Sequence, residues 1–179
     1  YTDYKSTNTP CGRDLVREYV DAFRAEGLHV GFYYSLIDWH HPDFTIDWLH
    51  PRRDDENAEE LNKNRDMTKY AEYMRNQVTE LLTNYGKIDI LWFDFSYTQR
   101  PENAKDWMSG KGKDEWEAEK LIETARSLQP HIIIDNRTEI EQDLWTPEQY
   151  QPMEWLKHKE TGELVTWEAC QTFSGSWGY

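Results

Sequence analysis

One short segment restricts the fold of this chain more than any other part of its sequence. It is the run Ile88-Asp89-Ile90-Leu91-Trp92-Phe93, which is apolar at nearly every position and ends directly on Asp94. Runs of this kind are typical of strands that are buried on both faces, as in parallel sheets. Parallel strands need long crossover connections, usually helices. We therefore expect strands and helices to alternate along the chain.

Three segments have the pattern of amphipathic helices. Apolar side chains recur at helical spacing over residues 13–26 and, most clearly, over 67–85. Gly27 and Gly86 are placed to end these two helices. A further helix is expected over 114–128.

Strands are expected between and after these helices. Residues 29–35 and 131–135 are short, apolar and rich in β-branched or aromatic side chains, and a last short strand is expected over 164–167. The polar stretch from about 36 to 66 has no sustained period and is expected to be a loop. The alternation predicts an α/β fold with right-handed crossovers.

The charge of the chain excludes some partners. It carries 34 acidic and 20 basic side chains, a formal net charge of −14. Such a field repels phosphate backbones and anionic membrane surfaces, so we expect no nucleic-acid partner and no membrane insertion. The two cysteines, Cys11 and Cys170, lie far apart and are expected to be half-buried free thiols.

Aromatic side chains are unusually frequent for so polar a chain, with nine Trp, eleven Tyr and six Phe. Sugar-binding clefts combine these groups, because a pyranose offers an apolar C–H face to a ring and hydroxyls to acids and amides. Most of the rings are nevertheless expected to pack in the core or against helices, as for Tyr19, Phe23 and Tyr70.

Polar side chains follow all three main predicted strands. Tyr33 and Tyr34 end the first, Asp94 the second, and Asn136-Arg137 the third. In β/α barrels and open α/β sheets, the site lies at this carboxyl end. Alternation also places Trp92 on the same face as Asp94. A pocket carboxylate and a cap on the following turn remain equal alternatives for Asp94 at this point.

A glycosidase needs a second carboxylate, about 5–5.5 Å from the first in retaining enzymes and about 6.5–9.5 Å away in inverting ones. Spacing does not choose among the downstream acids. The candidates are Glu139, Glu141, Asp143, Glu148, Glu154 and Glu168.

Metal and cofactor motifs are absent from the sequence. His40-His41 lies near Asp38 and Asp43, but adjacent His residues rarely share one ion, and a polar loop is the better interpretation. No glycine-rich phosphate loop or nucleophile elbow is present. We expect neither a metal nor an organic cofactor.

Four ordered stretches resemble the α-L-fucosidases of glycoside hydrolase family 29. They are residues 31–42 (GFYYSLIDWHHP), 88–94 (IDILWFD), 143–149 (DLWTPEQ) and 166–179, which begins TWEAC and ends SWGY. The opening residues 1–13 also resemble the segment that leads into a barrel helix of that family. The resemblance therefore covers nearly the whole chain.

The resemblance implies the middle strands and helices of a (β/α)8 TIM barrel. Residues 1–179 would be a fragment of a single β/α-barrel catalytic domain. The N-terminal strands, the C-terminal strands and a C-terminal β-sandwich would be absent from it. A full barrel typically takes about 250 residues, more than this chain contains.

The resemblance also implies roles for individual residues. Asp94 matches the nucleophile and Glu148 the general acid/base, a position that drifts within the family. Four residues match substrate-binding positions: Tyr33 (or Tyr34), Trp92, Arg137 and Trp177. The chain departs from the family just after the nucleophile, where small residues are common and Phe95-Ser96-Tyr97 stands here.

The implied reaction is release of terminal α-L-fucose from a fucosylated glycan through a fucosyl-enzyme intermediate. The family suggests a periplasmic, extracellular or lysosomal location. Two alternatives stay open. One is another barrel glycosidase, such as a galactosidase or hexosaminidase. The other is a non-catalytic sugar-binding fragment.

Overall fold

A small parallel sheet organises the structure, a computed structural model that describes residues 2–178. Its strands are β1 (Gly31–Ser35), β2 (Ile90–Asp94) and β3 (Ile133–Ile134), in the order β1-β2-β3 with both pairs parallel. The α/β prediction is confirmed. Tyr1, which begins the first stretch of the resemblance, and Tyr179, which ends the last, lie outside the described residues.

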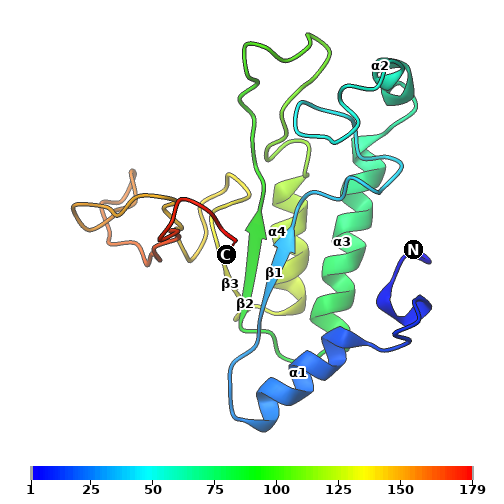
Figure 1. The fold of residues 1–179 in the computed structure, drawn as a ribbon. Helices are drawn as coiled ribbons and strands as arrows, with labels where there is room; N and C mark the ends of the chain where they lie inside the picture. Colours follow the sequence, from blue (N-terminus) through cyan, green and yellow to red (C-terminus); the bar gives the residue numbers. More distant parts are fainter. Residues whose placement is uncertain (1, 179) are drawn as a thin grey trace.

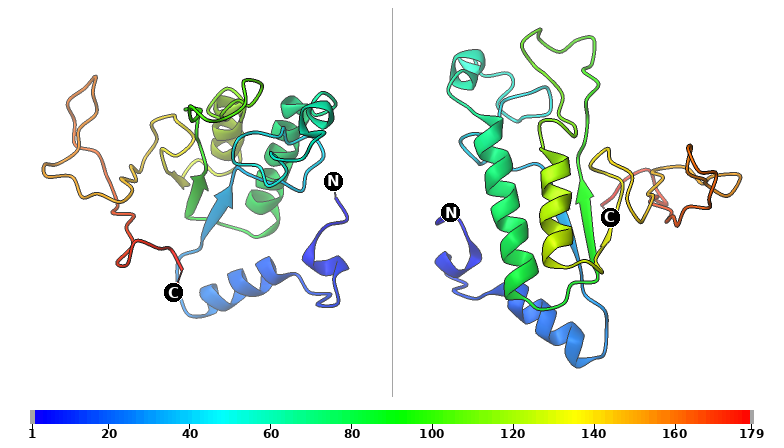
Figure 2. Two further views of the ribbon diagram at one scale, coloured as in Figure 1. Left: turned by 45° about the horizontal axis from the view of Figure 1, so that its top comes forward. Right: turned by 180° about the vertical axis from the view of Figure 1, so that it is seen from behind.

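Helices fill the crossovers between the strands and cover one face of the sheet. Figure 1 shows α3 and α4 side by side behind β1 and β2, with α1 below them, and the right-hand view of Figure 2 shows the same two helices from behind, in front of the strands. The helical elements are η1 (Ser6–Asn8), α1 (Leu15–Ala25), α2 (Ala58–Asn62), α3 (Met67–Asn84) and α4 (Ala118–Leu128).

Local sequence explains where α1 and α3 begin and where α1 ends. The side chain of Asp14 accepts from the backbone N–H of Arg17 at 2.9 Å and starts α1, and Asp66 caps α3 through Thr68 in the same way. After α1 the chain turns at Gly27, whose φ of 70° suits glycine.

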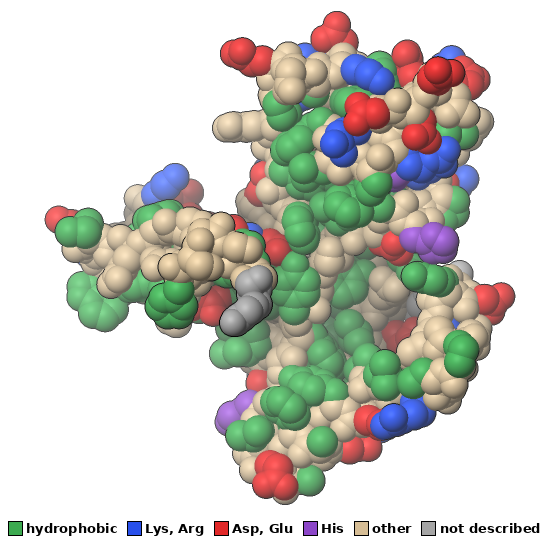
Figure 3. Space-filling view, viewed as in Figure 1, with side chains coloured by type: hydrophobic (Ala, Val, Ile, Leu, Met, Phe, Trp, Pro, Cys, Tyr) green, Lys and Arg blue, Asp and Glu red, His purple; other side chains and the backbone are tan. Residues whose placement is uncertain are grey.

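The two faces of β2 differ. Leu91 and Phe93 are fully buried toward the helices, whereas Ile90, Trp92 and Asp94 share the opposite face and are half-buried. Apolar side chains are visible on this second face in Figure 3. The predicted alternation is therefore confirmed, but the prediction of burial on both faces is wrong for this chain, because α3 and α4 cover only one.

Several predicted boundaries are also corrected. The loop expected over 36–66 contains the short helix α2. The helix expected over 114–128 begins only at Ala118, because Glu117 before it has a left-handed backbone with φ 45°. The strand expected over 131–135 is shorter and comprises only Ile133 and Ile134. The thiol of Cys11 is exposed rather than half-buried.

No continuous strand forms over 164–167. Isolated bridges replace it, and the parallel ones continue the order of the sheet. Asp135 pairs with Leu144, Trp145 with Trp167, and Glu148 with Cys170. Residues 145–178 form an extended arm beside the body, visible in orange and red in Figure 1. The arm thus carries Glu148 at a position that follows β3 in the sheet.

Within residues 2–178, no helix combines the length and the apolar character that a bilayer crossing requires.

A buried carboxyl group connects β3 to β2. Asp135 is fully buried, and its Oδ1 accepts from the backbone N–H of Phe93 at 3.1 Å. Its Oδ2 has no hydrogen-bond partner among the described residues. Burial raises the pKa of Asp135 to about 7. The folded protein therefore holds this proton at pH values where an exposed Asp has lost it.

Replacement of Asp135 should change how stability depends on pH. Between about pH 4 and pH 7 the unfolded chain loses a proton that the folded protein keeps, so this group lowers stability as pH rises. Asp135→Asn retains the acceptor for Phe93 and cannot ionise. The variant should therefore gain stability over the wild type between pH 4 and pH 8, by about 4 kcal/mol at most.

Urea unfolding at pH 4 and at pH 8, monitored by tryptophan fluorescence, measures the difference in stability between Asp135→Asn and the wild type. Asp106→Asn serves as control, because that side chain is fully exposed. If Asp135→Asn changes the free energy of unfolding by the same amount at pH 4 and at pH 8, the pKa of Asp135 is not raised in the folded protein.

Candidate active site

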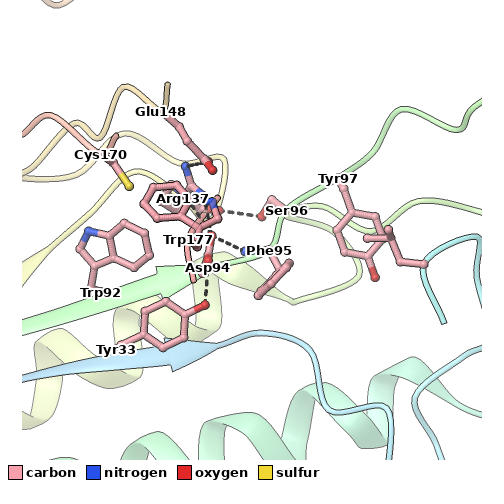
Figure 4. Close-up of a pocket in the computed structure, with 11 residues that line it drawn as sticks. Tyr33, Trp92, Asp94, Phe95, Ser96, Tyr97, Arg137, Glu148, Cys170 and Trp177 are labelled. Atoms are coloured by element: carbon pink, nitrogen blue, oxygen red, sulfur yellow. Dashed lines mark hydrogen bonds and ion pairs between the residues drawn. The ribbon is translucent and has the colours of Figure 1, made fainter. Parts of the chain in front are cut away.

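A pocket of about 750 Å³ opens at the carboxyl ends of the strands. All six residues singled out from the sequence line it, although they come from β1, β2, the turn after β3 and the arm. Figure 4 shows them gathered around Asp94. The six are Tyr33, Trp92, Asp94, Arg137, Glu148 and Trp177.

The carboxylate of Asp94 is held on both oxygens. The hydroxyl of Tyr33 donates to Oδ2 at 2.7 Å. Oδ1 accepts from Nη2 of Arg137 at 2.5 Å and from the backbone N–H of Phe95 at 2.9 Å. Both alternatives for Asp94 are therefore present together, because the side chain caps its own turn and also faces the pocket.

Arg137 joins the two carboxylates of the pocket. While Nη2 contacts Asp94, Nη1 lies 2.6 Å from Oε2 of Glu148. Burial opposes the charge of the guanidinium, but its hydrogen bonds to Asp94 and Glu148 outweigh burial and raise the pKa of Arg137. One cation thus keeps two acidic groups together in a half-buried site.

Aromatic rings form the strand side of the pocket. Tyr33 and Trp92 are register partners on β1 and β2, and their rings stack with centroids 5.4 Å apart and an interplanar angle of 22°. The guanidinium of Arg137 lies over the indole, 5.2 Å from its centroid. Burial and the neighbouring Asp94 raise the pKa of Tyr33, so its hydroxyl stays protonated and donates.

The choice between Tyr33 and Tyr34 is decided by strand alternation. Tyr34 points the other way, and its hydroxyl donates to Oε1 of Gln77 on α3 at 2.7 Å. Tyr33 therefore belongs to the pocket and Tyr34 to the packing between sheet and helices.

Glu168 has a structural partner that sequence reasoning missed. Its Oε1 accepts from the indole N–H of Trp92 and from the hydroxyl of Thr146, the latter at 2.9 Å. Glu168 is therefore behind the indole and does not line the pocket. No local pattern links residues so far apart in the sequence.

The remaining acids do not line the pocket. Asp143 pairs with Arg126, and Glu141 lies 3.2 Å from Nδ1 of His158. Glu139 accepts from the backbone N–H of Lys113, and Glu154 is exposed. Among the six candidate acids, Glu148 is the one beside Asp94.

Five further residues line the pocket without having been predicted to do so: Leu49, Phe95, Ser96, Tyr97 and Cys170. The hydroxyl of Ser96 donates to the backbone carbonyl of Arg137 at 2.7 Å. The sequence signal that could have pointed to Phe95 is its place directly after Asp94.

No cluster suited to a metal ion occurs within residues 2–178. The two adjacent histidines contact different rings: His40 packs on Tyr4 and His41 on Tyr73.

Known proteins resemble the whole chain. The family model described as Alpha-L-fucosidase matches residues 1–179. The solved structure of α-L-fucosidase isoenzyme 1 from Paenibacillus thiaminolyticus is 49% identical, with a TM-score of 0.80, over 99% of this chain and 42% of that one. A bacterial fucosidase solved with an inhibitor is 25% identical, with a TM-score of 0.66, over 96% and 37%.

A curated relative gives the same result at lower identity. The α-L-fucosidase of Dictyostelium discoideum is 25% identical over 99% of this chain, which corresponds to 34% of the relative. The chain thus spans less than half the length of these proteins. Since the family model covers every residue and the fold agrees with solved members, the chain belongs to the α-L-fucosidase family.

Proposed function

We propose that the protein containing this chain is a retaining α-L-fucosidase, with Asp94 as nucleophile and Glu148 as general acid/base. The observation that carries the proposal is the contact of one guanidinium, that of Arg137, with both carboxylates. Two carboxylates held on two nitrogens of one guanidinium can both reach one glycosidic bond. The resemblance to glycoside hydrolase family 29 favours the retaining mechanism for this pair.

In the proposed first step, an oxygen of Asp94 attacks C1 of the fucosyl ring while Glu148 gives its proton to the departing oxygen. The bond from C1 to the leaving group breaks, and a fucosyl ester of Asp94 forms. In the second step Glu148 takes a proton from water, which attacks C1 and releases Asp94. Arg137 and Tyr33 stabilise the carboxylate form of Asp94 before attack and after release.

The fucosyl ring itself would lie against the aromatic side of the pocket. Trp92 and Tyr33 offer carbon surface below Asp94, and Trp177 reaches the pocket from the end of the arm. Glu168 fixes the indole of Trp92 through its N–H. This arrangement supplies the apolar contacts that a deoxy sugar with a methyl group needs.

We also propose that residues 1–179 are the central part of a larger β/α-barrel domain. The helices α3 and α4 leave the second face of the sheet free, and Ile90 and Trp92 on that face are only half-buried. Large apolar side chains of the arm, such as Trp155 and Phe173, are exposed. Further strands on both sides of this sheet would cover these surfaces and close the barrel. The glycan substrate would then enter at the carboxyl ends of the strands.

Family membership favours fucosides as substrates over the galactosides or hexosaminides that another barrel glycosidase would hydrolyse. The complete protein should hydrolyse 4-nitrophenyl α-L-fucoside and not the corresponding galactoside or hexosaminide. Binding of fucose without any turnover would favour the non-catalytic alternative.

Removal of the nucleophile should almost abolish turnover. We expect Asp94→Gly in the complete protein to lose roughly 10³-fold or more in kcat, because the fucosyl ester cannot form. Added azide or formate should restore part of the rate by occupying the space of the lost carboxylate. Release of nitrophenol measures both effects, with Glu154→Gln as an exposed-acid control. Retention of most activity by Asp94→Gly would reduce Asp94 to a turn cap.

Removal of Glu148 should affect substrates according to their leaving groups. Glu148→Ala should slow a fucosyl disaccharide by about 10²–10⁴-fold, because its poor leaving group needs a proton. Activated aryl fucosides should lose much less in the first step. Azide should take the place of water in the second step and yield an α-fucosyl azide, detectable by NMR. If Glu168→Ala shows this pattern and Glu148→Ala does not, the acid/base is assigned wrongly.

The 179 residues alone should lack the activity of the complete protein. The edge of β1 has no strand partner among the described residues, and the edge of β3 has only an isolated bridge to Leu144, so both edges favour association in the isolated chain. Loss of substrate positioning also removes a large part of the barrier lowering, about 7–11 kcal/mol in well-oriented systems. Light scattering and an aryl fucoside assay test this expectation. A monodisperse monomer with full turnover would contradict the proposal of an incomplete barrel.

A further inference from the structure

The backbone carbonyl of Arg137 is held by a side chain that lines the pocket. The hydroxyl of Ser96 donates to this oxygen at 2.7 Å, and a dashed line between the two residues marks the bond in Figure 4. The guanidinium of Arg137 contacts both carboxylates of the pocket, and the position of the backbone decides where that guanidinium can reach. The bond from Ser96 therefore acts on the centre of the site.

Regular strand pairing ends before it reaches Arg137. The ladder between β2 and β3 ends at Ile134. Beyond it, two hydrogen bonds from side chains to backbone groups join the ends of the strands. The carboxyl group of Asp135 accepts from the backbone N–H of Phe93, and the hydroxyl of Ser96 donates to Arg137. The proposed nucleophile lies between Phe93 and Ser96 in the chain and is thus flanked by both bonds.

The hydroxyl of Ser96 is oriented by a residue of the core. The indole N–H of Trp116 donates to the hydroxyl oxygen at 3.2 Å. Trp116 is fully buried and packs against the rings of Phe44 and Tyr70, which fixes the indole. Because the hydroxyl oxygen accepts from Trp116, its single proton is left for the carbonyl of Arg137. A continuous series of contacts thus runs from the core to the guanidinium.

The residue after Ser96 is anchored as well. The hydroxyl of Tyr97 donates to Oδ2 of Asp47 at 2.7 Å, and the backbone N–H of Leu49 donates to Oδ1 at 2.9 Å. Asp47 is fully buried and is paired with Lys111, also fully buried. The turn that carries Ser96 therefore has little freedom to move its hydroxyl away from the carbonyl that it holds.

A direct contact with the sugar is the alternative role for Ser96, because the residue lines the pocket. A serine hydroxyl has one proton and can accept two hydrogen bonds. The proton is used on Arg137, and one acceptor position is used by Trp116. The second acceptor position could meet a sugar hydroxyl. The two roles predict different kinetics, because a contact with the sugar contributes to substrate binding.

We propose that Ser96 is a positioning residue, and that its bond to the carbonyl of Arg137 keeps the guanidinium between Asp94 and Glu148. This inference rests on the proposed function and adds a residue that acts through Arg137 without touching the reacting atoms. Loss of the hydroxyl would let Arg137 shift. Misplacement of groups that act in the transition state lowers kcat with little change in KM.

The first test compares two variants of Ser96 with the wild type in the complete protein, with 4-nitrophenyl α-L-fucoside as substrate. Ser96→Ala should lower kcat by about 3–10-fold, the usual effect of losing one neutral hydrogen bond, and should leave KM within about twofold of the wild type. Ser96→Thr keeps the hydroxyl and should keep most of kcat. A KM that rises in Ser96→Ala while kcat stays constant would assign the hydroxyl to the substrate and overturn the proposal.

A double-mutant cycle separates positioning from a general loss of stability. Arg137→Lys replaces the guanidinium by a single ammonium, which cannot contact both carboxylates in the same way. In that background Ser96→Ala should lower kcat by less than about twofold, because the group that the hydroxyl positions is gone. Equal losses of kcat in the wild-type and Arg137→Lys backgrounds would overturn the proposal. Thermal melting of each variant checks that it is folded at the assay temperature.

The assay of the wild type distinguishes failure of this inference from failure of the proposed function. If the wild type hydrolyses the aryl fucoside and Ser96→Ala keeps the full kcat, this inference alone is overturned. If the wild type does not hydrolyse the aryl fucoside, the proposed function fails and this inference fails with it.

Discussion

The contact of Arg137 with Asp94 and Glu148 is the interaction on which the candidate site depends. Two carboxylates at close range repel each other, and each would favour protonation or displacement without a cation between them. The guanidinium supplies separate nitrogens for the two groups, which lysine could not do with a single ammonium. It also lies over Trp92, so that the two carboxylates and the indole contact the same guanidinium.

That arrangement requires strand ends that do not move. Leu91 and Phe93 are fully buried against the helices, and this burial fixes which side chains of β2 face the pocket. A shift of one residue in register would turn Asp94 toward α3 and α4 and would leave Phe93 in the pocket. Parallel pairing with β1 then brings Tyr33 beside Trp92, and Asp135 ties β3 to the same strand through Phe93.

The loops beyond the strands obtain their order from a different source. The buried pair of Asp47 and Lys111 joins two loops that share little regular structure. Both side chains are fully buried, so their ion pair has to offset a desolvation cost, and burial lowers the pKa of Lys111. Loss of either partner would leave a charge uncompensated in the interior. We therefore see this pair as the reason that Leu49 and Tyr97 can form one wall of the pocket.

Local pattern in the sequence determined the helices, the alternation of strands and the common face of Trp92 and Asp94. These features depend on neighbours within a few residues, and periodicity records them. Local spacing left three questions open that the tertiary structure decided. Glu148, of the six candidate acids, is the one beside Asp94, Tyr33 rather than Tyr34 enters the pocket, and Glu168 holds Trp92. Those contacts join distant segments, and the arm that carries two of them has no periodic pattern. Their positions follow from packing across the sheet, which no local spacing encodes.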